Sequence, residues 1–263
     1  MASDLDIARQ AAMAGAEIVR REFGQPVDAE FKGDGNPVTE VDRRAEAAIL
    51  AVIQRLAPDD QVLSEEAGGG GWDGERIWIV DPVDGTVNFI HRIPQVSVSV
   101  ALWDRGSPRV GVVVDPLRGE LFEAAAGRGA SSKGQPMAVS TQVDLKMSLI
   151  ATGFPYDRDR FAAGYASNLG GVLASVQGVR RLGSAALDLA WLACGRYEGY
   201  WEFGIQPWDA AAGVLIVIEA GGQVTNHLGG PHRLDDPGLI ASNGAIHPLL
   251  VEAVSRHLPE HVR

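Results

Sequence analysis

Residues 77–89 read IWIVDPVDGTVNF, an apolar run that leads directly into an acidic turn. The apolar residues 77–80 predict a buried strand, and Asp81 and Asp84 follow it three residues apart. Two carboxylates at the end of one strand can both point at the same place beyond the edge of a sheet. Pro82 fixes the backbone angle φ between them, which limits how that place can move.

The end of this turn favours contact with an anion. Gly85 permits a tight turn and the close approach of another group to the backbone. If Thr86 opens a helical turn, its free backbone N–H groups face the same place, which suits a phosphate. The residues leave one alternative open, in which Asp81 and Asp84 only cap the turn.

Three further acidic segments have a structural alternative of the same kind. Glu65 and Glu66 follow a short apolar run and also fit a solvated surface pair. Asp209 lies in the first turn of an apolar helix, where a carboxylate stabilises the helix dipole. Asp42 follows Thr39 by three residues at a helix start, which fits a capping box. Taken singly, each segment is explained by structure alone.

Helical and strand patterns mix along the whole chain and predict an α/β fold. Two Gly-rich segments, 32–38 and 68–71, are interpreted as a mobile loop and a flexible connection. The expected helices are residues 7–18, 41–56, 161–176, 184–194, 207–220 and 248–257, and the expected strands are 77–80, 96–102, 110–114, 121–124, 148–151, 197–202, 224–225 and 239–241. This order favours a layered sandwich whose subdomains comprise residues 1–140 and 141–263.

The overall charge bears on the choice of partner. The 263-residue chain has a net charge of −11, which argues against nucleic acid or an anionic membrane surface as a general partner. The N-terminal segment lacks the apolar core of a secretory signal, the longest apolar run is too short to cross a membrane, and the single cysteine cannot form an internal disulfide. The cytoplasm is the expected location. A phosphate that approaches so acidic a protein needs a local positive charge, from a basic side chain, a helix N-terminus or a bound metal ion.

In combination, the acidic segments resemble the inositol monophosphatase family. The motifs that match are D-P-x-D-G-T-x-N-F at 81–89, E-E at 65–66, P-V-T-x-x-D at 37–42, G-S-A-A-x-D-L at 183–189 and W-D-x-A-A with E-A-G-G across 208–222. They occur in the family's order between about residues 30 and 245. One small departure is Ser64, which stands where the branch often has a glycine before E-E.

The resemblance implies a fold, a cofactor and a set of site residues. The implied fold is a five-layered αβαβα sandwich with the active site between its halves, in a homodimer that requires magnesium and is often inhibited by lithium. The implied metal ligands are Glu65, Asp81, the Val83 carbonyl, Asp84 and Asp209. The implied catalytic residues are Glu65, Thr86 and Asp42. Thr86 and Asp42 are the pair that orients the attacking water. The implied substrate contacts are Asp84, Gly183, Ser184, Ala185 and Glu202, with the backbone N–H groups of Gly85 and Thr86 on the phosphate and Lys32 in a mobile lid loop.

Gathered carboxylates of this kind suit hard cations. Two like charges about 4 Å apart repel by about 4 kcal/mol at an effective dielectric constant of about 20, so the group requires protons or divalent ions. All the candidate ligands are oxygen atoms, which favours Mg²⁺ over Zn²⁺, and two to three such ions would turn the acidic pocket into a receptor for phosphate. Because the chain has no nucleophile motif, the expected reaction is direct attack of an activated water molecule.

The second half of the chain bears on the substrate. Segments 183–189 and 197–202 look most like the inositol monophosphatase branch, which predicts myo-inositol 1-phosphate as the substrate. The alternatives left open are a fructose-1,6-bisphosphatase or another sugar or histidinol phosphatase and, in a different class, a regulatory partner of the transcription machinery. A nucleotide would require more positive charge around a second phosphate than the sequence offers. His227 and His232, in a Gly/Pro-rich loop, are expected to be exposed.

Overall fold

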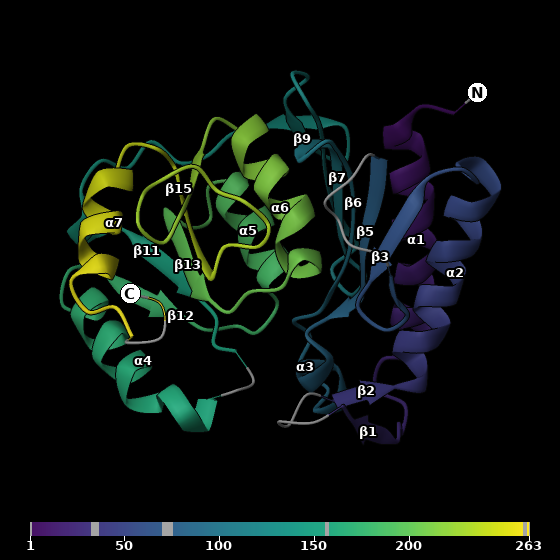
Figure 1. Ribbon diagram of the computed structural model, residues 1–263, viewed down its shortest axis with the longest axis horizontal. Coiled ribbons are helices and arrows are strands. Elements are labelled where there is room, and N and C mark those ends of the chain that lie inside the picture. Colours follow the sequence, from purple (N-terminus) through teal and green to yellow (C-terminus); the bar gives the residue numbers. More distant parts are fainter. Residues whose placement is uncertain (1, 33–36, 70–75, 156–157, 260–261, 263) are drawn as a thin grey trace.

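The protein's elements stack in five layers, α-β-α-β-α, as the sequence predicts (Figure 1). The computed structural model describes residues 2–32, 37–69, 76–155, 158–259 and 262, so that most of the expected mobile loop and part of the second Gly-rich connection lie outside the described residues. The helical layers, from one side to the other, are α1 (Asp4–Glu22) with α2 (Glu40–Leu56), then α5 (Ala185–Ala193) with α6 (Pro207–Glu219), then α4 (Arg158–Leu173) with α7 (His247–Ser255).

The first sheet brings two acidic segments to one edge. Within the described residues its strand order is β10-β9-β8-β7-β6-β5-β3-β4. The bounds are β3 (Gln61–Ser64), β4 (Gly68–Gly69), β5 (Arg76–Asp84), β6 (Ser97–Asp104), β7 (Ser107–Asp115), β8 (Glu120–Ala125), β9 (Ala130–Ser132) and β10 (Gln135–Met137). Because β3 and β5 are parallel neighbours, their carboxyl ends meet, and Glu65 therefore lies beside the end of the strand that carries Asp81 and Asp84.

The second sheet presents its own edge to the same region. Its order among the described residues is β12-β11-β13-β15-β14, with β11 parallel to β13. The bounds are β11 (Leu149–Thr152), β12 (Gly178–Arg180), β13 (Gly199–Phe203), β14 (Gln223–Asn226) and β15 (Gly238–Ser242). Outside the two sheets lie the hairpin β1 (Ala29–Phe31) and β2 (Pro37–Thr39), the short helix α3 (Thr86–Ile90) and the 3-10 turn η1 (Leu145–Met147).

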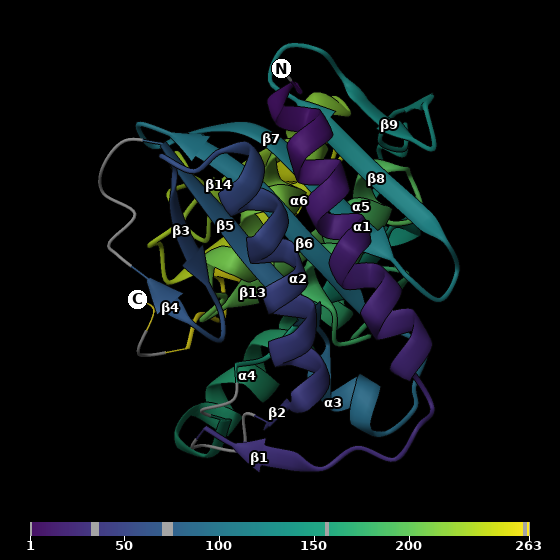
Figure 2. The same cartoon turned by 90° about the vertical axis from the view of Figure 1, so that its right-hand side faces the viewer.

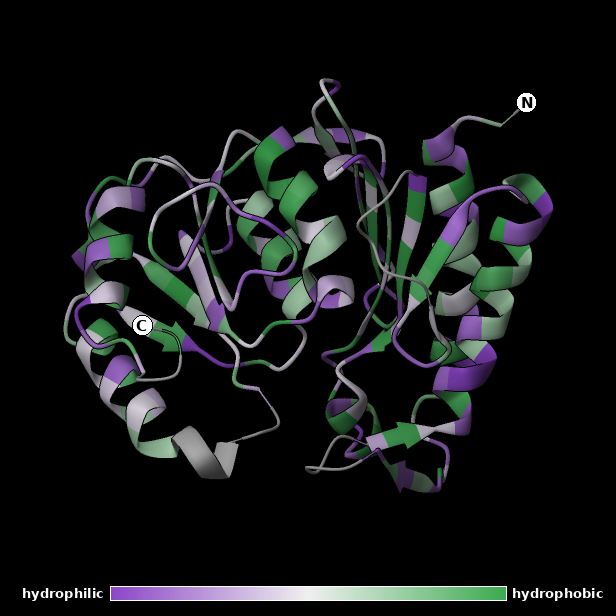
Figure 3. Cartoon of the chain, viewed as in Figure 1, coloured by the Kyte–Doolittle hydropathy of each residue, from purple (hydrophilic) through white to green (hydrophobic). Residues whose placement is uncertain are grey.

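Three hydrophobic clusters explain the layering. One joins α1 and α2 to the outer face of the first sheet, which these helices cross (Figure 2). A second joins both sheets to α5 and α6, and a third joins α4 and α7 to the far face of the second sheet. Since α5 and α6 have a sheet on either side, they are apolar around most of their surface (Figure 3), whereas α1 and α2 keep polar residues on their outer face.

The expected helices and longer strands all occur, with ends shifted by a few residues. The sequence did not predict β1, β2, β4, β9, β10 and β12, each of which has three residues or fewer and is too short to show an alternating pattern. The expectation of exposure for His227 is wrong, because the residue is only 4% exposed and its Nε2 lies 2.8 Å from the carbonyl oxygen of Val262. His232 is half-buried as well. Their loop folds back on the body of the protein. No helix in the described ranges combines the length and apolarity that crossing a bilayer requires.

Candidate active site

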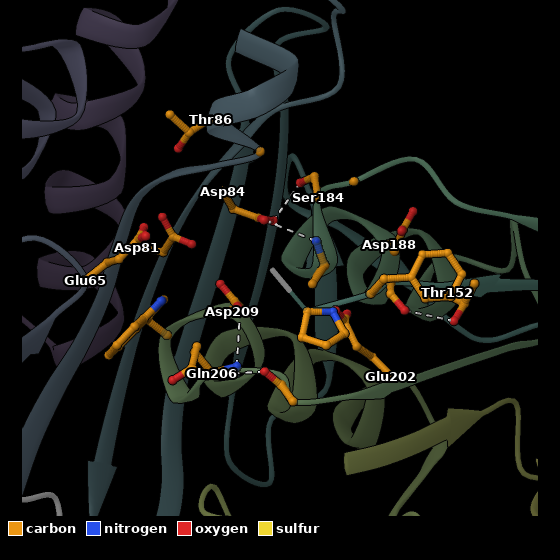
Figure 4. Close-up of a pocket in the computed structure, with 18 of the residues that line it drawn as sticks. Glu65, Asp81, Asp84, Thr86, Thr152, Ser184, Asp188, Glu202, Gln206 and Asp209 are labelled. Atoms are coloured by element: carbon orange, nitrogen blue, oxygen red, sulfur yellow. Dashed lines mark hydrogen bonds between the residues drawn. The ribbon is translucent and has the colours of Figure 1, made fainter. Parts of the chain in front are cut away.

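A cleft of about 440 Å³ is lined by the carboxyl ends of β5, β11 and β13 and by the first turns of α5 and α6. Among the residues that the sequence predicted for the site, all line this cleft except Asp42, which is fully buried behind Thr86. Figure 4 shows Glu65 and Asp81 on one side, Asp188 and Glu202 on the other, and Asp84 and Asp209 between them. The lining residues from the prediction are Lys32, Glu65, Asp81, Val83, Asp84, Gly85, Thr86, Gly183, Ser184, Ala185, Glu202 and Asp209.

Three aspartates form the centre of the cleft. One carboxylate oxygen from each of Asp81, Asp84 and Asp209 lies within 4.8 Å of the other two. Asp81 and Asp84 end β5, and the pairing with β6 shifts register between them. Asp209 reaches the same place from the first turn of α6, so that residues more than a hundred positions apart converge.

The capping roles that the sequence left open also exist. Oδ1 of Asp81 accepts a hydrogen bond of 2.9 Å from the backbone N–H of Val83. Oδ2 of Asp209 accepts one of 3.1 Å from the backbone N–H of Gln206, in a capping box at the start of α6. Because a carboxylate has about four lone-pair sites, one local hydrogen bond fixes its direction and leaves acceptor capacity for the cleft. The structural and the functional readings are therefore compatible.

Asp84 is bound by the start of α5. Its carboxylate accepts hydrogen bonds from the Ser184 hydroxyl at 2.6 Å and from the backbone N–H groups of Ala185 at 3.2 Å and Ala186 at 2.8 Å. The Ser97 hydroxyl adds a fourth at 3.1 Å. A helix N-terminus stabilises a negative charge, which explains why a buried carboxylate can lie there. Two of the predicted substrate contacts, Ser184 and Ala185, thus bind Asp84 in this structure.

Thr86 and Asp42 form the predicted pair. The Thr86 hydroxyl lies 2.9 Å from Oδ1 of Asp42 and 3.0 Å from the carbonyl oxygen of Val83, and its single proton can be donated to either. Asp42 is oriented by the backbone N–H of Thr39 at 3.0 Å. The turn requires glycine at Gly85, which has φ 99°, and a Cβ there would lie 2.9 Å from the carbonyl oxygen of Gln95.

Glu65 is bound to a cation of the chain itself. The Lys32 ammonium lies 3.4 Å from Oε1 of Glu65 and also pairs with Glu66. Within the described residues, the cluster whose oxygens lie within 4.8 Å of one another consists of the three aspartates and does not include Glu65. Figure 4 nevertheless shows the Glu65 carboxylate directed towards Asp81.

The carboxyl groups of the cleft have pKa values above their ordinary values. Burial raises the pKa of Asp81 well above its usual value, and the charges of Glu65, Asp84 and Asp209 raise it further. Burial likewise raises the pKa of Asp209, whose carboxyl points into the cleft although part of the residue is exposed. Burial raises the pKa of Glu65 to about 7, against the opposing charge of Lys32. Crowded, partly dehydrated carboxyls of this kind hold protons unless another positive charge replaces them.

The far wall of the cleft combines the predicted Glu202 with Asp188 and Arg181, for which the sequence predicted no role. Asp188, on α5, is 1% exposed, and its Oδ1 has no hydrogen-bond partner among the described residues. Glu202 accepts a hydrogen bond from the Tyr200 hydroxyl, and burial raises its pKa to about 7. Arg181 lines the cleft from the loop before α5. The available signal for Asp188 was an acidic residue in the first turn of an otherwise apolar helix.

This donor set fits magnesium. Three carboxylates from β5 and α6 converge with oxygen atoms only, the atoms that Mg²⁺ prefers, and their raised pKa values mark a site that a divalent cation would stabilise. The described part of the cleft lining contains no cysteine or histidine that would favour a softer metal.

Comparisons with known proteins agree with this geometry. The sequence profile of the inositol monophosphatase family matches residues 1–258. An inositol-1-monophosphatase of Synechocystis sp. is 46% identical over 254 residues, which are 95% of this chain and 88% of that protein. A protein of Salmonella typhimurium named Nus factor SuhB is 39% identical over 261 residues, 98% of this chain and 96% of its own. A solved inositol monophosphatase of Anabaena (Nostoc) sp. superposes with a TM-score of 0.88 at 41% identity, covering 98% of each chain. The chain therefore belongs to the inositol monophosphatase family and is a phosphatase.

Proposed function

We propose that this phosphatase hydrolyses myo-inositol 1-phosphate, or a closely similar phosphate monoester of a small polyol, in a magnesium-dependent reaction. One observation supports the proposal above all others: one carboxylate oxygen from each of Asp81, Asp84 and Asp209 lies within 4.8 Å of the other two, in a cleft that is also lined by Thr86, the partner of the buried Asp42. A bound cation beside a hydroxyl that can take a proton suits the hydrolysis of a phosphate ester.

In this proposal, the metal ligands are Glu65, Asp81, the carbonyl oxygen of Val83, Asp84 and Asp209, with two to three ions in the site. Bound magnesium would supply positive charge for the phosphate oxygens and for activation of the attacking water. The remaining steps belong to the chain's own side chains. Glu65 lies 3.4 Å from Lys32, and this ion pair must loosen before Glu65 can serve as a ligand.

Thr86 and Asp42 orient the attacking water and remove its proton. The Thr86 hydroxyl donates its proton towards Asp42 at 2.9 Å and so turns a lone pair towards the cleft. Water that donates to this lone pair is held on one line of attack, and its proton can pass by way of Thr86 to Asp42. Burial raises the pKa of Asp42, which makes its carboxylate a better proton acceptor. The backbone N–H groups of Gly85 and Thr86 would hold the phosphate.

The departing alcohol lies against the second half of the chain. Asp84, Glu202 and the segment from Gly183 to Ala185 would contact its hydroxyl groups. Glu202 is buried at the end of the cleft that lies away from Glu65 and Asp81, where an acceptor of hydrogen bonds selects for a hydroxylated leaving group over an apolar one (Figure 4).

A substrate panel tests the proposal. Phosphate release from inositol 1-phosphate, fructose phosphates, histidinol phosphate and a nucleotide is measured with and without magnesium, and with lithium. We expect inositol 1-phosphate to give the highest kcat/KM, with magnesium required and lithium inhibitory. A higher kcat/KM for any other class on the panel would reassign the substrate.

The variant Asp81→Asn tests the metal centre. Loss of one carboxylate from the cluster should reduce kcat by at least about 10²-fold, the size of effect expected for one electrostatic contact in a transition state. Asp59→Asn removes an exposed carboxylate elsewhere and serves as the matched control. Normal turnover by folded Asp81→Asn would refute the proposed ligand set.

Two further properties and a second candidate function complete the proposal. We propose that the protein acts as a homodimer and in the cytoplasm, which light scattering and cell fractionation would test. A second candidate function is suggested by the 39% identity to a protein named Nus factor SuhB. For this candidate, a regulatory partner of the transcription machinery, purified RNA polymerase should retain both the wild type and Asp81→Asn in a pull-down.

A further inference from the structure

Asn88, the asparagine of the D-P-x-D-G-T-x-N-F motif, has a buried side chain that no step of the proposed reaction uses. It lies on α3, two residues after Thr86, and is 8% exposed. Its Nδ2 donates to three backbone carbonyl oxygens, those of Gln95 at 2.8 Å, Leu182 at 2.7 Å and Gly183 at 3.3 Å. Because carbonyl oxygens only accept, the atom that faces them is the amide nitrogen, and its two hydrogens serve the two shorter bonds.

These hydrogen bonds join two turns from opposite halves of the chain. Leu182 and Gly183 belong to the loop before α5 and lie 94 and 95 positions from Asn88. The turns also meet through their backbones: a Cβ on Gly85 would lie 3.0 Å from the carbonyl oxygen of Gly183, and a Cβ on Gly183 would lie 3.1 Å from Nδ2 of Asn88. Glycine at both positions therefore allows an approach that a larger residue would prevent.

The start of α5 depends on where this loop is held. The backbone N–H groups of Ala185 and Ala186 have no partner within their helix and donate instead to Asp84, at 3.2 Å and 2.8 Å. The Ser184 hydroxyl turns towards the same carboxylate (Figure 4). Since Gly183 directly precedes these residues, Asn88 fixes the position from which Ser184 and Ala185 face the cleft.

Asp84, in contrast, has support that does not depend on Asn88. It ends β5 and pairs with Ser97 of β6, whose hydroxyl also donates to it at 3.1 Å. A loosened loop before α5 would therefore leave Asp84 on its strand. The shift would fall on the segment that we assign to the departing alcohol, and the two sides of the cleft would lose their fixed spacing.

We propose that Asn88 is a positioning residue that sets the spacing between the phosphate turn, Gly85 and Thr86, and the leaving-group loop, residues 182–185, and thereby governs selection of the leaving alcohol. This inference rests on the proposed function for the nature of the alcohol. Asn88 does not line the cleft and acts through Gly183. The role requires an amide, because a carboxylate of the same shape has no proton to donate and would repel the carbonyl oxygens.

The first test compares two substrates that share the reacting phosphate. Inositol 1-phosphate has a poor leaving group with hydroxyls for the loop to contact, whereas p-nitrophenyl phosphate has a good leaving group without them, so remote contacts matter less to its transition state. Asn88→Asp should reduce kcat/KM for inositol 1-phosphate by about 10²-fold, the effect expected of a displacement of about 1 Å. The fall for p-nitrophenyl phosphate should be much smaller, so that the ratio of the two values changes.

The second test needs no turnover. Because only Asp84 protects the N–H groups of Ala185 and Ala186, their hydrogen–deuterium exchange reports how firmly α5 begins. Asn88→Asp should accelerate this exchange by about ten-fold or more, as expected for loss of at least one buried hydrogen bond. Asn88→Ala, which removes the donor without adding a charge, should show the same two changes and serves if Asn88→Asp fails to fold.

Asn243 provides the matched control. It is 6% exposed, and its Nδ2 likewise joins distant segments, donating to the Ser140 hydroxyl at 3.1 Å and to the carbonyl oxygen of Gln142 at 2.8 Å. It does not line the cleft. Asn243→Asp should therefore lower the melting temperature but leave the substrate ratio and the exchange of Ala185 unchanged.

The possible outcomes separate this inference from the proposed function. An unchanged ratio of kcat/KM values, or unchanged exchange at Ala185 and Ala186, would each overturn the positioning role of Asn88, whatever the melting temperature does. The same changes in Asn243→Asp would also overturn it. Absence of phosphate release from inositol 1-phosphate by the wild type would instead contradict the proposed function, and the exchange measurement would still decide whether Asn88 holds the start of α5.

Discussion

At the level of single residues, the acidic side chains of the cleft combine a local and a distant role. Asp209 closes a capping box on its own helix while one of its oxygens lies within 4.8 Å of Asp81 and Asp84. Asp42 caps α2 through Thr39 and holds Thr86 with its other oxygen. A carboxylate whose direction is fixed by its own helix loses little further conformational entropy when it binds a ligand, and this favours precise positioning.

The Thr86–Asp42 pair gives a prediction about rate. Thr86→Val keeps the shape of the side chain and removes the hydroxyl, and Asp42→Asn keeps an acceptor oxygen and removes the charge. Both should reduce kcat by about 10²- to 10⁴-fold, the usual contribution of a positioned proton acceptor, with little change in KM. Steady-state kinetics on folded variants measure this split. An unchanged kcat in Thr86→Val would exclude the hydroxyl from proton transfer.

At the level of elements, α2 supports two parts of the site: it carries Asp42 in its first turn, and it holds the turn that carries Glu65. One turn after Asp42, the buried Glu46 accepts hydrogen bonds from the Ser64 hydroxyl and from the backbone N–H groups of Glu66 at 3.2 Å and Ala67 at 3.0 Å. These contacts fix the turn that carries Glu65. Ser64, which departs from the glycine common in the family branch, thus supplies a hydroxyl that joins this turn to α2.

Loss of this support should weaken the metal site. We expect Glu46→Ala to raise the dissociation constant for magnesium by about ten-fold or more, as for other residues that orient metal ligands. Isothermal titration calorimetry measures the constant directly, and Glu46→Gln, which keeps an acceptor oxygen, should restore most of the affinity. A folded Glu46→Ala protein with unaltered magnesium affinity would show that the turn is held by its backbone alone.

At the level of the whole molecule, the central layer joins the two halves. The hydrophobic cluster around α5 and α6 includes residues of the first sheet such as Ile79 and Val113 together with Tyr200 and Leu239 of the second. The site therefore forms at the junction, because Asp81 and Asp84 come from one half and Asp209 from the other. The subdomain boundary at residue 140 falls between β10 and η1 and stays a prediction.

The crowded carboxyls predict how stability depends on pH. Glu65 and Glu202 have ordinary values of 4.5 and folded pKa values of about 7, raised mainly by burial. A raised pKa means that the stabilisation is complete below about 4.5 and is lost as pH rises through about 7. Without divalent ions, the free energy of unfolding should thus fall across this window, by up to about 1.4 kcal/mol per pH unit for each group.

Magnesium should reverse this trend, because it competes with protons for the same oxygens. Differential scanning calorimetry at pH 5.5 and pH 8 should show a larger increase in Tm on adding magnesium at the higher pH. Asp81→Asn should reduce that increase. An equal increase at both pH values would indicate that the cation binds outside the carboxyl cluster.

The amino-acid sequence alone determined the family, the layered fold class and most of the residues that line the cleft. The D-P-V-D-G-T motif predicts its turn correctly because the backbone at Gly85, with φ 99°, depends on neighbouring residues. The capping box at Asp209 is predictable for the same reason. Helices and long strands were predictable for the same reason, since their apolar spacing is a local property.

Only the tertiary structure decided which side chains share partners across the chain. The burial of His227, the bond between Glu46 and Ser64, and the pairing of Lys32 with Glu65 all depend on segments far apart in sequence. No spacing rule links such segments, because their proximity follows from how the sheets and helices pack. The charge that a ligand meets in the cleft is therefore a property of the fold, even where every contributing residue is visible in the sequence.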